Sequence, residues 1–295
     1  MQDIIIFGSE GNGMALAQEL LEQNAQEMAS SGGGVNILFF IDNNPTKYDE
    51  RVNLSINEKK YEFAIKPPQE VLNTQFDKIH IATMSGCESC LRQLSSYGVD
   101  MLKVDSSYVK VKLEARINFL KSFARECKDK GIEGDVAEVG VFQGDFAQKI
   151  NHYFPHKKLY LFDTFEGFDT RDLQNESDET KKMGRYLNDT SINLVMSKMP
   201  NPSKVIIKKG YFPETAAGLE NERFCFVNLD TDLYEPIKAG LEFFYPKMQR
   251  GGVILIHDYF NSAYPGVKRA VDEFCTKHNI FAIPGDDISI AVCKA

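Results

Sequence analysis

Two apolar runs in the last third of the chain each end in side chains that can bind a metal ion or transfer a proton. The runs are residues 224–229, followed by Asp230 and Asp232, and residues 251–256, followed by His257 and Asp258. Each run has the length and apolarity of a buried strand. Ligands of an open α/β sheet bind beyond the carboxyl ends of its strands, so two neighbouring strands of this kind would bring their polar tips to one pocket. We expect the chemistry to take place there.

A glycine turn earlier in the chain suggests the cofactor. Residues 135–139 form a predicted strand that runs into Gly140, Val141 and Gly144. Glycines let a ligand approach the backbone closely, and the helix predicted from about Asp145 offers free amide groups. Asp145 places a negative charge where a phosphate would otherwise sit, which favours a ligand without a pyrophosphate group. S-adenosylmethionine fits, because its amino-acid end is zwitterionic and its sulfonium is positive.

The next two strand ends offer contacts for an adenosine group. Residues 159–162 form a predicted strand that ends in Asp163, and a carboxylate at this place can accept hydrogen bonds from both ribose hydroxyls. A turn or helix-cap role for Asp163 is the alternative. Gly210, Tyr211 and Phe212 follow the third strand, where the rings could stack on adenine or belong to the core.

The elements that position these residues form an α/β protein with two Rossmann-like domains. Residues 1–105 and 131–295 are the domains, and residues 106–130 form a connector helix with apolar residues at i, i+4 spacing. The predicted strands of the second domain are residues 135–139, 158–162, 204–208, 223–229, 252–256, 280–283 and 289–293. The last two are close enough for a hairpin. The sequence therefore predicts a seven-stranded, mostly parallel sheet with one antiparallel strand.

The first domain begins with the order of a nucleotide-binding unit. A buried strand at residues 4–7 is followed by Gly8, Gly11 and Gly13, a helix, and a second strand that ends in Asp42. The glycine spacing is GxxGxG and differs from the GxGxxG dinucleotide pattern. No Tyr and Lys pair with recognisable spacing accompanies it, which argues against an NAD-dependent enzyme.

A long polar segment, residues 166–200, lies between the second and third strands of the second domain. A loop of this length inside a compact domain is uncommon unless it is a lid or a binding loop. We expect a partly helical cover over the pocket, with a disordered insertion as the alternative.

Composition excludes several classes of function. The 295 residues carry a net charge of −8 and show no cluster of Lys and Arg, which argues against nucleic acid as a partner. No stretch approaches the roughly 20 apolar residues of a membrane span, and the N-terminus has no export signal, so a cytoplasmic location is expected. Cys87 and Cys90 have CxxC spacing but no second ligand pair, so a zinc site is not expected.

Five motifs in the second domain closely resemble the macrocin O-methyltransferase family. They are residues 138–144, residues 162–167, residues 210–215, residues 229–235, and the group Tyr245, Gly251, Gly252, Asp258 and Tyr259. The resemblance covers residues 131–295. Members of this family methylate sugar hydroxyls, mostly with magnesium. The resemblance thus implies a class I S-adenosylmethionine-dependent methyltransferase fold for this domain.

The resemblance also implies roles for single residues. The expected cofactor contacts are Glu138, Gly140, Val141, Gly144, Asp163, Thr164, Phe165, Gly210, Tyr211 and Asp230. Asp230 would also ligate the metal, and Asp232 would be the general base for the sugar hydroxyl. The family usually has two aspartates where this chain has His257 and Asp258. Imidazole is a poorer ligand than carboxylate for Mg²⁺, so this difference bears on the metal.

Two mechanisms are open on these residues. In the first, Asp230 and Asp258, with His257 as a further candidate ligand, hold Mg²⁺ beside the hydroxyl while Asp232 takes the proton. In the second, no metal binds and His257 is itself the base. A structural role for His257, with its ring bonded to a backbone carbonyl, is the remaining interpretation.

The first domain has a resemblance of its own, and the two together give the predicted function. Residues 1–105 are similar to Rossmann-like modules that precede catalytic domains in sugar-modifying enzymes, which implies nucleotide-sugar binding or a structural role. We expect O-methylation of a small-molecule or glycan sugar, either free or nucleotide-linked, in glycan or natural-product biosynthesis. A non-catalytic nucleotide-sugar-binding or scaffolding protein is the alternative. The sequence leaves the oligomeric state open, and the resemblance makes a homo-oligomer one possibility, because family members often associate.

Overall fold

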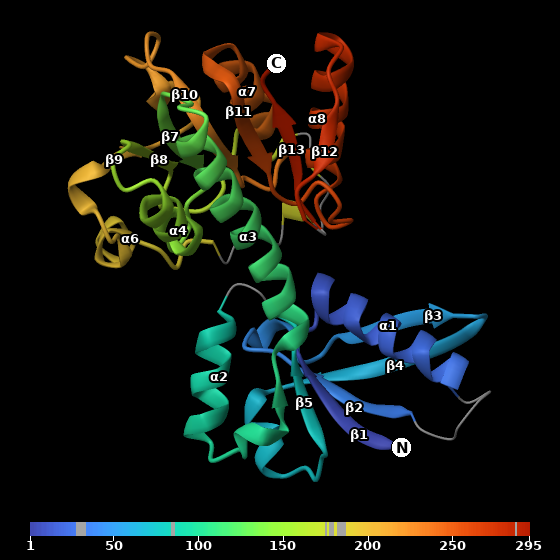
Figure 1. Cartoon of the computed structure of the whole chain (residues 1–295). Helices are drawn as coiled ribbons and strands as arrows, with labels where there is room; N and C mark the ends of the chain where they lie inside the picture. The colour runs from blue at the N-terminus through green and yellow to red at the C-terminus, as the bar shows by residue number, and fades with distance from the viewer. Residues whose placement is uncertain (28–33, 84–85, 175, 177–179, 182–186, 287) are drawn as a thin grey trace. The chain divides into compact units, whose positions relative to one another are not determined.

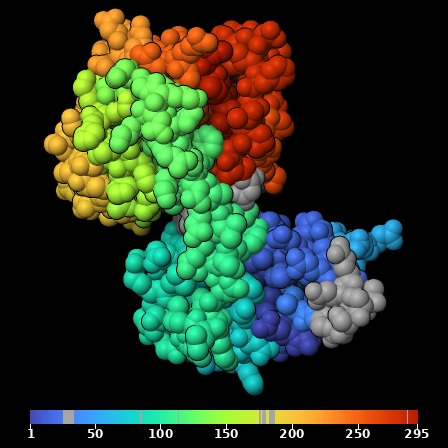
Figure 2. Space-filling view, viewed as in Figure 1, coloured from blue at the N-terminus to red at the C-terminus, as the bar shows by residue number. Residues whose placement is uncertain are grey.

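Apolar runs of the sequence form two sheets in the computed structural model of the chain, which describes residues 1–27, 34–83, 86–174, 176, 180–181, 187–286 and 288–295. These residues divide into two units, Met1–Glu114 and Ala115–Ala295 (Figures 1 and 2). The division falls inside helix α3 (Ser107–Asp129), which lies within the predicted connector at residues 106–130.

The sheet of the second unit has seven strands in the order β12-β13-β11-β10-β7-β8-β9 (Figure 1). In chain order the strands are β7 (Asp135–Val139), β8 (Leu159–Asp163), β9 (Val205–Lys209), β10 (Phe224–Leu229), β11 (Met248–Ile256), β12 (Ala282–Pro284) and β13 (Ile290–Cys293). β13 runs antiparallel to both of its neighbours, and the other pairings are parallel. The predicted α/β class, with a mostly parallel seven-stranded sheet, is confirmed.

Helices cover both faces of this sheet, which explains why its strands are apolar without alternation. On one face, α7 (Tyr234–Phe244) and α8 (Pro265–His278) share a core with inward side chains of β7, β8 and β10. On the other face, α3, α4 (Asp145–Tyr153) and α6 (Ile192–Lys198) pack on the alternate strand residues. All six residues of β10 are buried as a result. Among the described residues, no helix has the length and apolarity that crossing a membrane requires.

The strand order reverses beside β7. From β7 the chain adds β8 and β9 on one side, then crosses to add β10 and β11 on the other. In open α/β sheets such a reversal leaves a crevice at the carboxyl ends of the two diverging strands, and ligands bind there. The fold therefore directs attention to the loops that follow β7 and β10.

The first unit contains a six-stranded sheet in the order β3-β4-β2-β1-β5-β6, with α1 (Gly11–Glu27) and α2 (Cys87–Ser96). Its strands are β1 (Gln2–Phe7), β2 (Val35–Ile41), β3 (Arg51–Ile56), β4 (Lys59–Lys66), β5 (Lys78–Ile81) and β6 (Val104–Asp105). The hairpin of β3 and β4 is absent from our sequence prediction. Its signal is a clear alternation in which Val52, Leu54 and Ile56 are buried.

The glycine turn after β1 is closed by its own side chains. Gly13 lies so close to Gly8 that a Cβ on Gly13 would be 1.9 Å from the Gly8 carbonyl oxygen. The Ser9 hydroxyl donates to the Asp42 carboxylate at 2.6 Å, and Lys47 lies 2.6 Å from Glu10 and 3.4 Å from Asp42. Asp42, predicted from its place at a strand end, thus ties the turn to the second strand.

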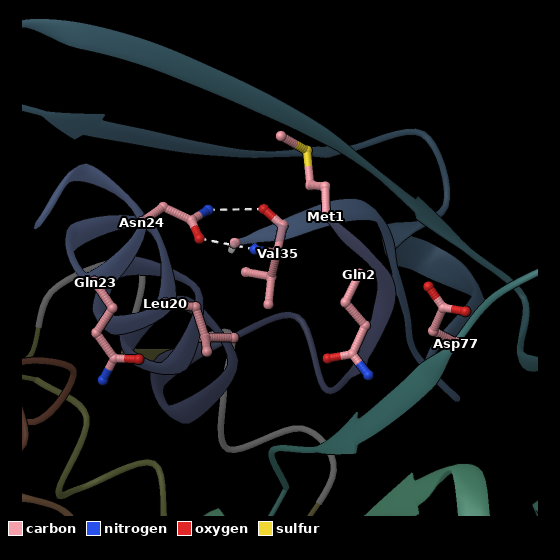
Figure 3. Close-up of a pocket in the computed structure, with 8 residues that line it drawn as sticks. Met1, Gln2, Leu20, Gln23, Asn24, Val35 and Asp77 are labelled. Atoms are coloured by element: carbon pink, nitrogen blue, oxygen red, sulfur yellow. Dashed lines mark hydrogen bonds between the residues drawn. The ribbon is translucent and has the colours of Figure 1, made fainter. Parts of the chain in front are cut away.

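An open hollow of about 550 Å³ in the first unit lies at the amino ends of β1 and β2 (Figure 3). The side chain of Asn24 joins α1 to β2 there, because its amide donates to the Val35 carbonyl at 2.7 Å and its oxygen accepts from the Val35 amide at 2.8 Å. The glycine turn follows the carboxyl end of β1. The hollow is therefore at the opposite end of the strands from the predicted nucleotide site.

Replacing Phe244 by alanine should destabilise the second unit strongly. Phe244 is fully buried, and its ring centroid lies 5.0 Å from that of Phe224 and 5.9 Å from that of Phe212. Removing a buried phenylalanine ring costs about 3–5 kcal/mol. The measurement is urea unfolding followed by circular dichroism, because the chain has no tryptophan.

The matched control for this change is Phe281→Ala, since the Phe281 side chain is 90% exposed. It should alter the free energy of unfolding by no more than about 0.5 kcal/mol. Equal unfolding midpoints for the two variants would contradict the packing described for α7.

Candidate active site

The polar tips of β10 and β11 lie together. Leu229 and Ile256, the last residues of these strands, are paired in register, so the following residues leave the sheet at the same level. Nδ1 of His257 is 3.1 Å from Oδ1 of Asp230 and 2.6 Å from Oδ2 of Asp258. The structure therefore brings Asp230 together with His257 and Asp258, although the whole of helix α7 lies between them in the sequence.

Two aspartates of this cluster have left-handed backbone conformations. Asp232 has a φ of 62° and Asp258 a φ of 59°. Few residues other than glycine adopt such angles, although aspartate tolerates them better than most. The amide of Leu233 donates to the carbonyl of Thr231 at 2.7 Å, which holds the first of these turns tightly. Backbone strain of this kind is typical of functional sites, where the rest of the structure compensates for it.

Opposite charges compete with burial in this cluster. Burial is the largest single influence and would raise the pKa of Asp230 and Asp258, but the charge of His257 and its hydrogen bonds, joined at Asp230 by Arg116, together outweigh it and lower the pKa of both carboxyls. Burial and the charge of Arg116 would lower the pKa of His257, but Asp230 and Asp258 overcome them and raise it to about 10. The imidazole is therefore protonated at neutral pH.

Asp232 differs from its two neighbours. Burial raises its pKa well above the usual value, and the charges of Asp258 and Asp230 raise it further. A hydrogen bond joins the carboxyl groups of Asp232 and Asp258. Without a ligand, the protonated form of Asp232 is therefore favoured.

Arg116 of α3 also enters the cluster, and our sequence analysis did not select it. Its Nη2 donates to Oδ2 of Asp230 at 2.8 Å and to Oδ1 of Asn228 at 2.9 Å. Asn228 in turn donates to Oε1 of Glu138 at 2.9 Å. The available signal was Asn228, a polar residue inside an otherwise apolar strand, which needs buried partners.

The glycines of the turn after β7 are required by packing. Gly140 has a φ of 82°, and a Cβ there would be 1.9 Å from the carbonyl oxygen of Asp230. Gly144, with a φ of 79°, faces Val195 of α6, whose Cγ1 would be 3.0 Å from an added Cβ. Both residues were predicted as cofactor contacts. Their backbone lies at the carboxyl end of β7 beside the residues that follow β10, where the strand order reverses.

Asp163 holds the same turn in place. Its Oδ2 accepts from the amides of Val141 at 2.7 Å and Phe142 at 2.9 Å, and its Oδ1 accepts from the amide of Phe165 at 2.6 Å. In the absence of a ligand Asp163 thus acts as a turn residue, the alternative that the sequence left open. A carboxylate has about four acceptor positions, so one remains for a ribose hydroxyl. The ribose contact stays a prediction.

The other predicted cofactor residues near β8 lie in the same loops. The Thr164 hydroxyl donates to the carbonyl of Gly167 at 2.6 Å. Phe165 is buried, with a φ of 56°, and belongs to the core on the α4 face. The amide of Gly210 donates to the carbonyl of Asp163 at 2.9 Å. These bonds link the loops after β8 and β9.

Tyr211 and Phe212 have different environments. The Tyr211 hydroxyl donates to Oδ1 of Asp172 at 2.9 Å, and the guanidinium carbon of Arg171 lies 3.5 Å from the centre of the Tyr211 ring. Burial and the bond to Tyr211 act in opposite directions on Asp172, and burial prevails, raising the pKa of this carboxyl to about 6. Phe212 is buried among other phenylalanine rings, so it belongs to the core.

The polar segment at residues 166–200 contacts the loops at this end of the sheet. Glu176 accepts from the amide of Tyr234 at 2.9 Å, at the first residue of α7. The side chain of Gln143 donates to the carbonyl of Asp189 at 2.8 Å. Residues 175, 177–179 and 182–186 of the predicted cover lie outside the described residues. The cover itself stays a prediction.

The donors of the cluster suit a small divalent cation. One donor atom each from Asp230, His257 and Asp258 lie within 4.8 Å of one another. The two carboxylates provide the oxygen ligands that Mg²⁺ prefers, whereas Nδ1 of His257 is a softer donor. Because two of its three donor residues are carboxylates, the site fits magnesium.

Comparison with known proteins identifies the family. The family described as Macrocin-O-methyltransferase (TylF) matches residues 53–289, so the match starts well before residue 131, where we expected it. Mycinamicin III 3''-O-methyltransferase of Micromonospora griseorubida is 25% identical over 69% of this chain and 84% of its own length. A tetracenomycin C 4'-O-methyltransferase of Streptomyces olivaceus, named for its 2,3-dimethoxy-α-L-rhamnosyl substrate, is 24% identical over 51% of this chain and 61% of its own length.

A solved structure supports the fold. The O-methyltransferase NovP aligns with a TM-score of 0.53 at 22% identity, over 61% of this chain and 80% of its own. The sheet order, the polar cluster and the family match agree with one another. The chain belongs to the macrocin O-methyltransferase family and is an S-adenosylmethionine-dependent O-methyltransferase.

Proposed function

We propose that this enzyme methylates a sugar hydroxyl, with Asp232 as the general base and with Asp230 and Asp258 as ligands of Mg²⁺. The observation that carries this proposal is the convergence of Asp230 and Asp258 beside the Gly140 turn. Asp232 interacts with both of these carboxylates. The sugar class is supported by the rhamnosyl substrate in the name of one relative. A small molecule, a glycan or a nucleotide-linked sugar could present the hydroxyl.

The methyl transfer needs an activated oxygen. The hydroxyl oxygen forms a bond to the methyl carbon while the bond from that carbon to the sulfonium breaks, which leaves S-adenosylhomocysteine. The hydroxyl proton goes to Asp232, which must be ionised to accept it. In the empty site the pKa of Asp232 is raised, first by burial and then by the charge of Asp258. Positive charge beside Asp258 therefore favours the active form of the base.

Oxygen atoms of Asp230 and Asp258 would hold the cation, and Nδ1 of His257 lies in the same group of donors. When bound, Mg²⁺ supplies Lewis acidity that lowers the pKa of the hydroxyl. In the empty site the imidazolium of His257 places a positive charge between the two carboxylates. A cation and a protonated His257 compete for this position, so His257 has to lose its proton or move when the cation binds.

The second mechanism of the sequence analysis, with His257 as base, has less support. Burial and Arg116 lower the pKa of His257, but the two aspartates raise it to about 10. An imidazolium cannot accept a proton, so Asp232 is the better candidate for the base.

For the first unit by itself we propose nucleotide-sugar binding or a structural role. The GxxGxG turn follows β1, and Asp42 ends the neighbouring strand β2. The family match includes half of this unit, beginning at residue 53. Because the family match extends into the first unit, it is consistent with a role for this unit in the same biosynthetic reaction.

Asp232→Asn should abolish turnover while cofactor affinity stays near that of the wild type. Removing a general base costs typically 10²–10⁴-fold in rate. Transfer of a labelled methyl group to a panel of sugars measures the rate, and calorimetric titration with S-adenosylhomocysteine measures the affinity. Asp129→Asn, which makes the same change at an exposed residue of α3, is the control. Transfer to no sugar by the wild-type enzyme would instead favour the non-catalytic alternative.

Removing divalent cations should lower turnover of the wild-type enzyme. We expect EDTA to reduce the rate of methyl transfer and added Mg²⁺ to restore it, because the hydroxyl loses its Lewis acid. Asp258→Asn should remove most of the response to Mg²⁺ by deleting one oxygen ligand. Full turnover in excess EDTA would contradict the metal assignment. The positive charge of His257 would then be the one that offsets the negative charges of Asp230 and Asp258.

The protonated ring of His257 should stabilise the cation-free enzyme in a defined pH range. Its pKa rises from 6.5 to about 10 on folding, so this stabilisation is fully present below pH 6.5 and is lost as the pH rises through 10. In EDTA, the thermal midpoint of the wild type should exceed that of His257→Gln most below pH 6.5, and the difference should shrink toward pH 10. The exposed His156, changed to Gln, is the control. A difference that does not vary over this range would contradict the ion pairs described.

A further inference from the structure

Three buried polar atoms beside the Gly140 turn have no hydrogen-bond partner among the described residues. They are Nε of Arg116, Oε2 of Glu138 and Oγ1 of Thr231. A buried polar atom without a partner costs free energy, about 1–3 kcal/mol and more for charged groups. Such atoms in one place indicate a ligand that supplies the missing bonds.

The three atoms belong to one connected group. Asn228 joins Glu138 to Arg116 through hydrogen bonds of 2.9 Å each. Thr231 follows Asp230, the other partner of Arg116, and its methyl carbon would lie 3.2 Å from a Cβ on Gly140. The group therefore borders the glycine turn that follows β7.

The guanidinium of Arg116 is held rigidly, and its buried Nε has no partner among the described residues. Nη2 donates to both Asn228 and Asp230, and the guanidinium carbon lies 3.9 Å from the centre of the Phe146 ring. Phe146 is the second residue of α4, directly after the glycine turn. An arginine fixed in this way loses little conformational freedom when it binds an anion.

The unpartnered atoms have complementary chemistry. Nε of Arg116 is a donor on a positive group and suits a carboxylate, whereas Oε2 of Glu138 is an acceptor on an acidic group and suits an ammonium. Glu138 is 1% exposed, so its acceptor is not satisfied by bulk water. Burial raises the pKa of Glu138 well above its usual value, so the neutral carboxyl is favoured until a positive group comes beside it. An ammonium at Oε2 would supply that charge and favour the ionised acceptor. A cationic donor and this ionisable acceptor beside one glycine turn fit the zwitterionic end of an α-amino acid.

We propose that Arg116 binds the carboxylate of the methionine part of S-adenosylmethionine, and that Glu138 accepts a hydrogen bond from its ammonium group. This assignment rests on the proposed function and adds Arg116 to its site. Arg116 keeps its bonds to Asp230 and Asn228 and uses Nε for the cofactor. The same side chain then links the cofactor to the carboxylate that faces the acceptor.

The experiment compares S-adenosylhomocysteine with two analogues by calorimetric titration. One analogue has hydrogen in place of the carboxylate, and the other has hydrogen in place of the amino group. The wild-type enzyme should bind each analogue at least about tenfold more weakly than the parent, because each leaves one buried charged group unpaired.

Arg116→Gln should bind the parent and the analogue without a carboxylate with nearly equal affinity, and it should still discriminate against the analogue without an amino group. Glu138→Gln should give the reverse pattern. Arg116→Lys, which keeps the charge but not the planar fork, should retain part of the discrimination. Arg125→Gln, an exposed change on the same helix, should behave as the wild type.

The results of these titrations distinguish a failure of the Arg116 assignment from a failure of the proposed function on which it rests. If the wild type does not bind S-adenosylhomocysteine, the proposed function fails. If it binds the parent and the analogue without a carboxylate equally, only the Arg116 assignment fails. If Arg116→Gln weakens all three ligands by the same factor, Arg116 is a structural residue that acts through Asp230. The wild-type comparison needs no variant, so a variant that fails to fold does not prevent the test.

Discussion

The charge of Asp230 is the feature on which the rest of the site depends. Its two carboxylate oxygens face different cations, since Oδ2 accepts from Arg116 at 2.8 Å and Oδ1 lies 3.1 Å from Nδ1 of His257. Asp230 is only partly buried, but its desolvation would by itself raise its pKa and favour the neutral form. The two cations therefore keep Asp230 ionised, and their own positions are fixed by it. Asp232 and Asp258 then have to share the remaining charge, which separates their pKa values in opposite directions.

The strand pattern of the second unit could be predicted from sequence because its physical cause is simple. Strands buried on both faces are continuous apolar runs, and each is interrupted at the sheet edge by polar residues. β7 has the predicted bounds, whereas β12 begins two residues later than expected. The hairpin of β3 and β4 was missed although β3 alternates clearly, because the polar residues of β4 show no matching alternation. The residue pattern of a segment predicts a strand reliably only where burial determines the residue type at most of its positions.

The candidate site was predictable in part for the same reason. Asp230, Asp232, His257 and Asp258 follow apolar strands, so topology alone brings them to one edge of the sheet. Arg116 could not be found in this way, because an arginine in an amphipathic helix resembles any solvated residue. Its partners come from a strand more than a hundred positions later. Likewise, Asp163 accepts three hydrogen bonds from backbone amides in the loops after β7 and β8. The paths of these loops cannot be predicted from residue spacing.

In the proposed metal site, one difference from the pattern that the family resemblance implies changes the charge of the donor set. The resemblance implies an aspartate at this position, and His257 would replace that negative group with one whose raised pKa favours the protonated form. The side chains of this cluster are then close to electrically balanced among themselves, whereas a further carboxylate in place of His257 would add repulsion that only a cation relieves. This difference links occupancy of the site to proton release.

Helix α3 supplies Arg116 near its middle, before the first strand of the methyltransferase sheet begins at Asp135. A fragment cut at residue 131, the boundary suggested by strands alone, would keep every strand of that sheet and lose this guanidinium. Asn228 and Asp230 would then face solvent or one another without their shared cation. Anyone shortening the protein for crystallisation or engineering should therefore begin it ahead of residue 107, so that the whole helix is retained.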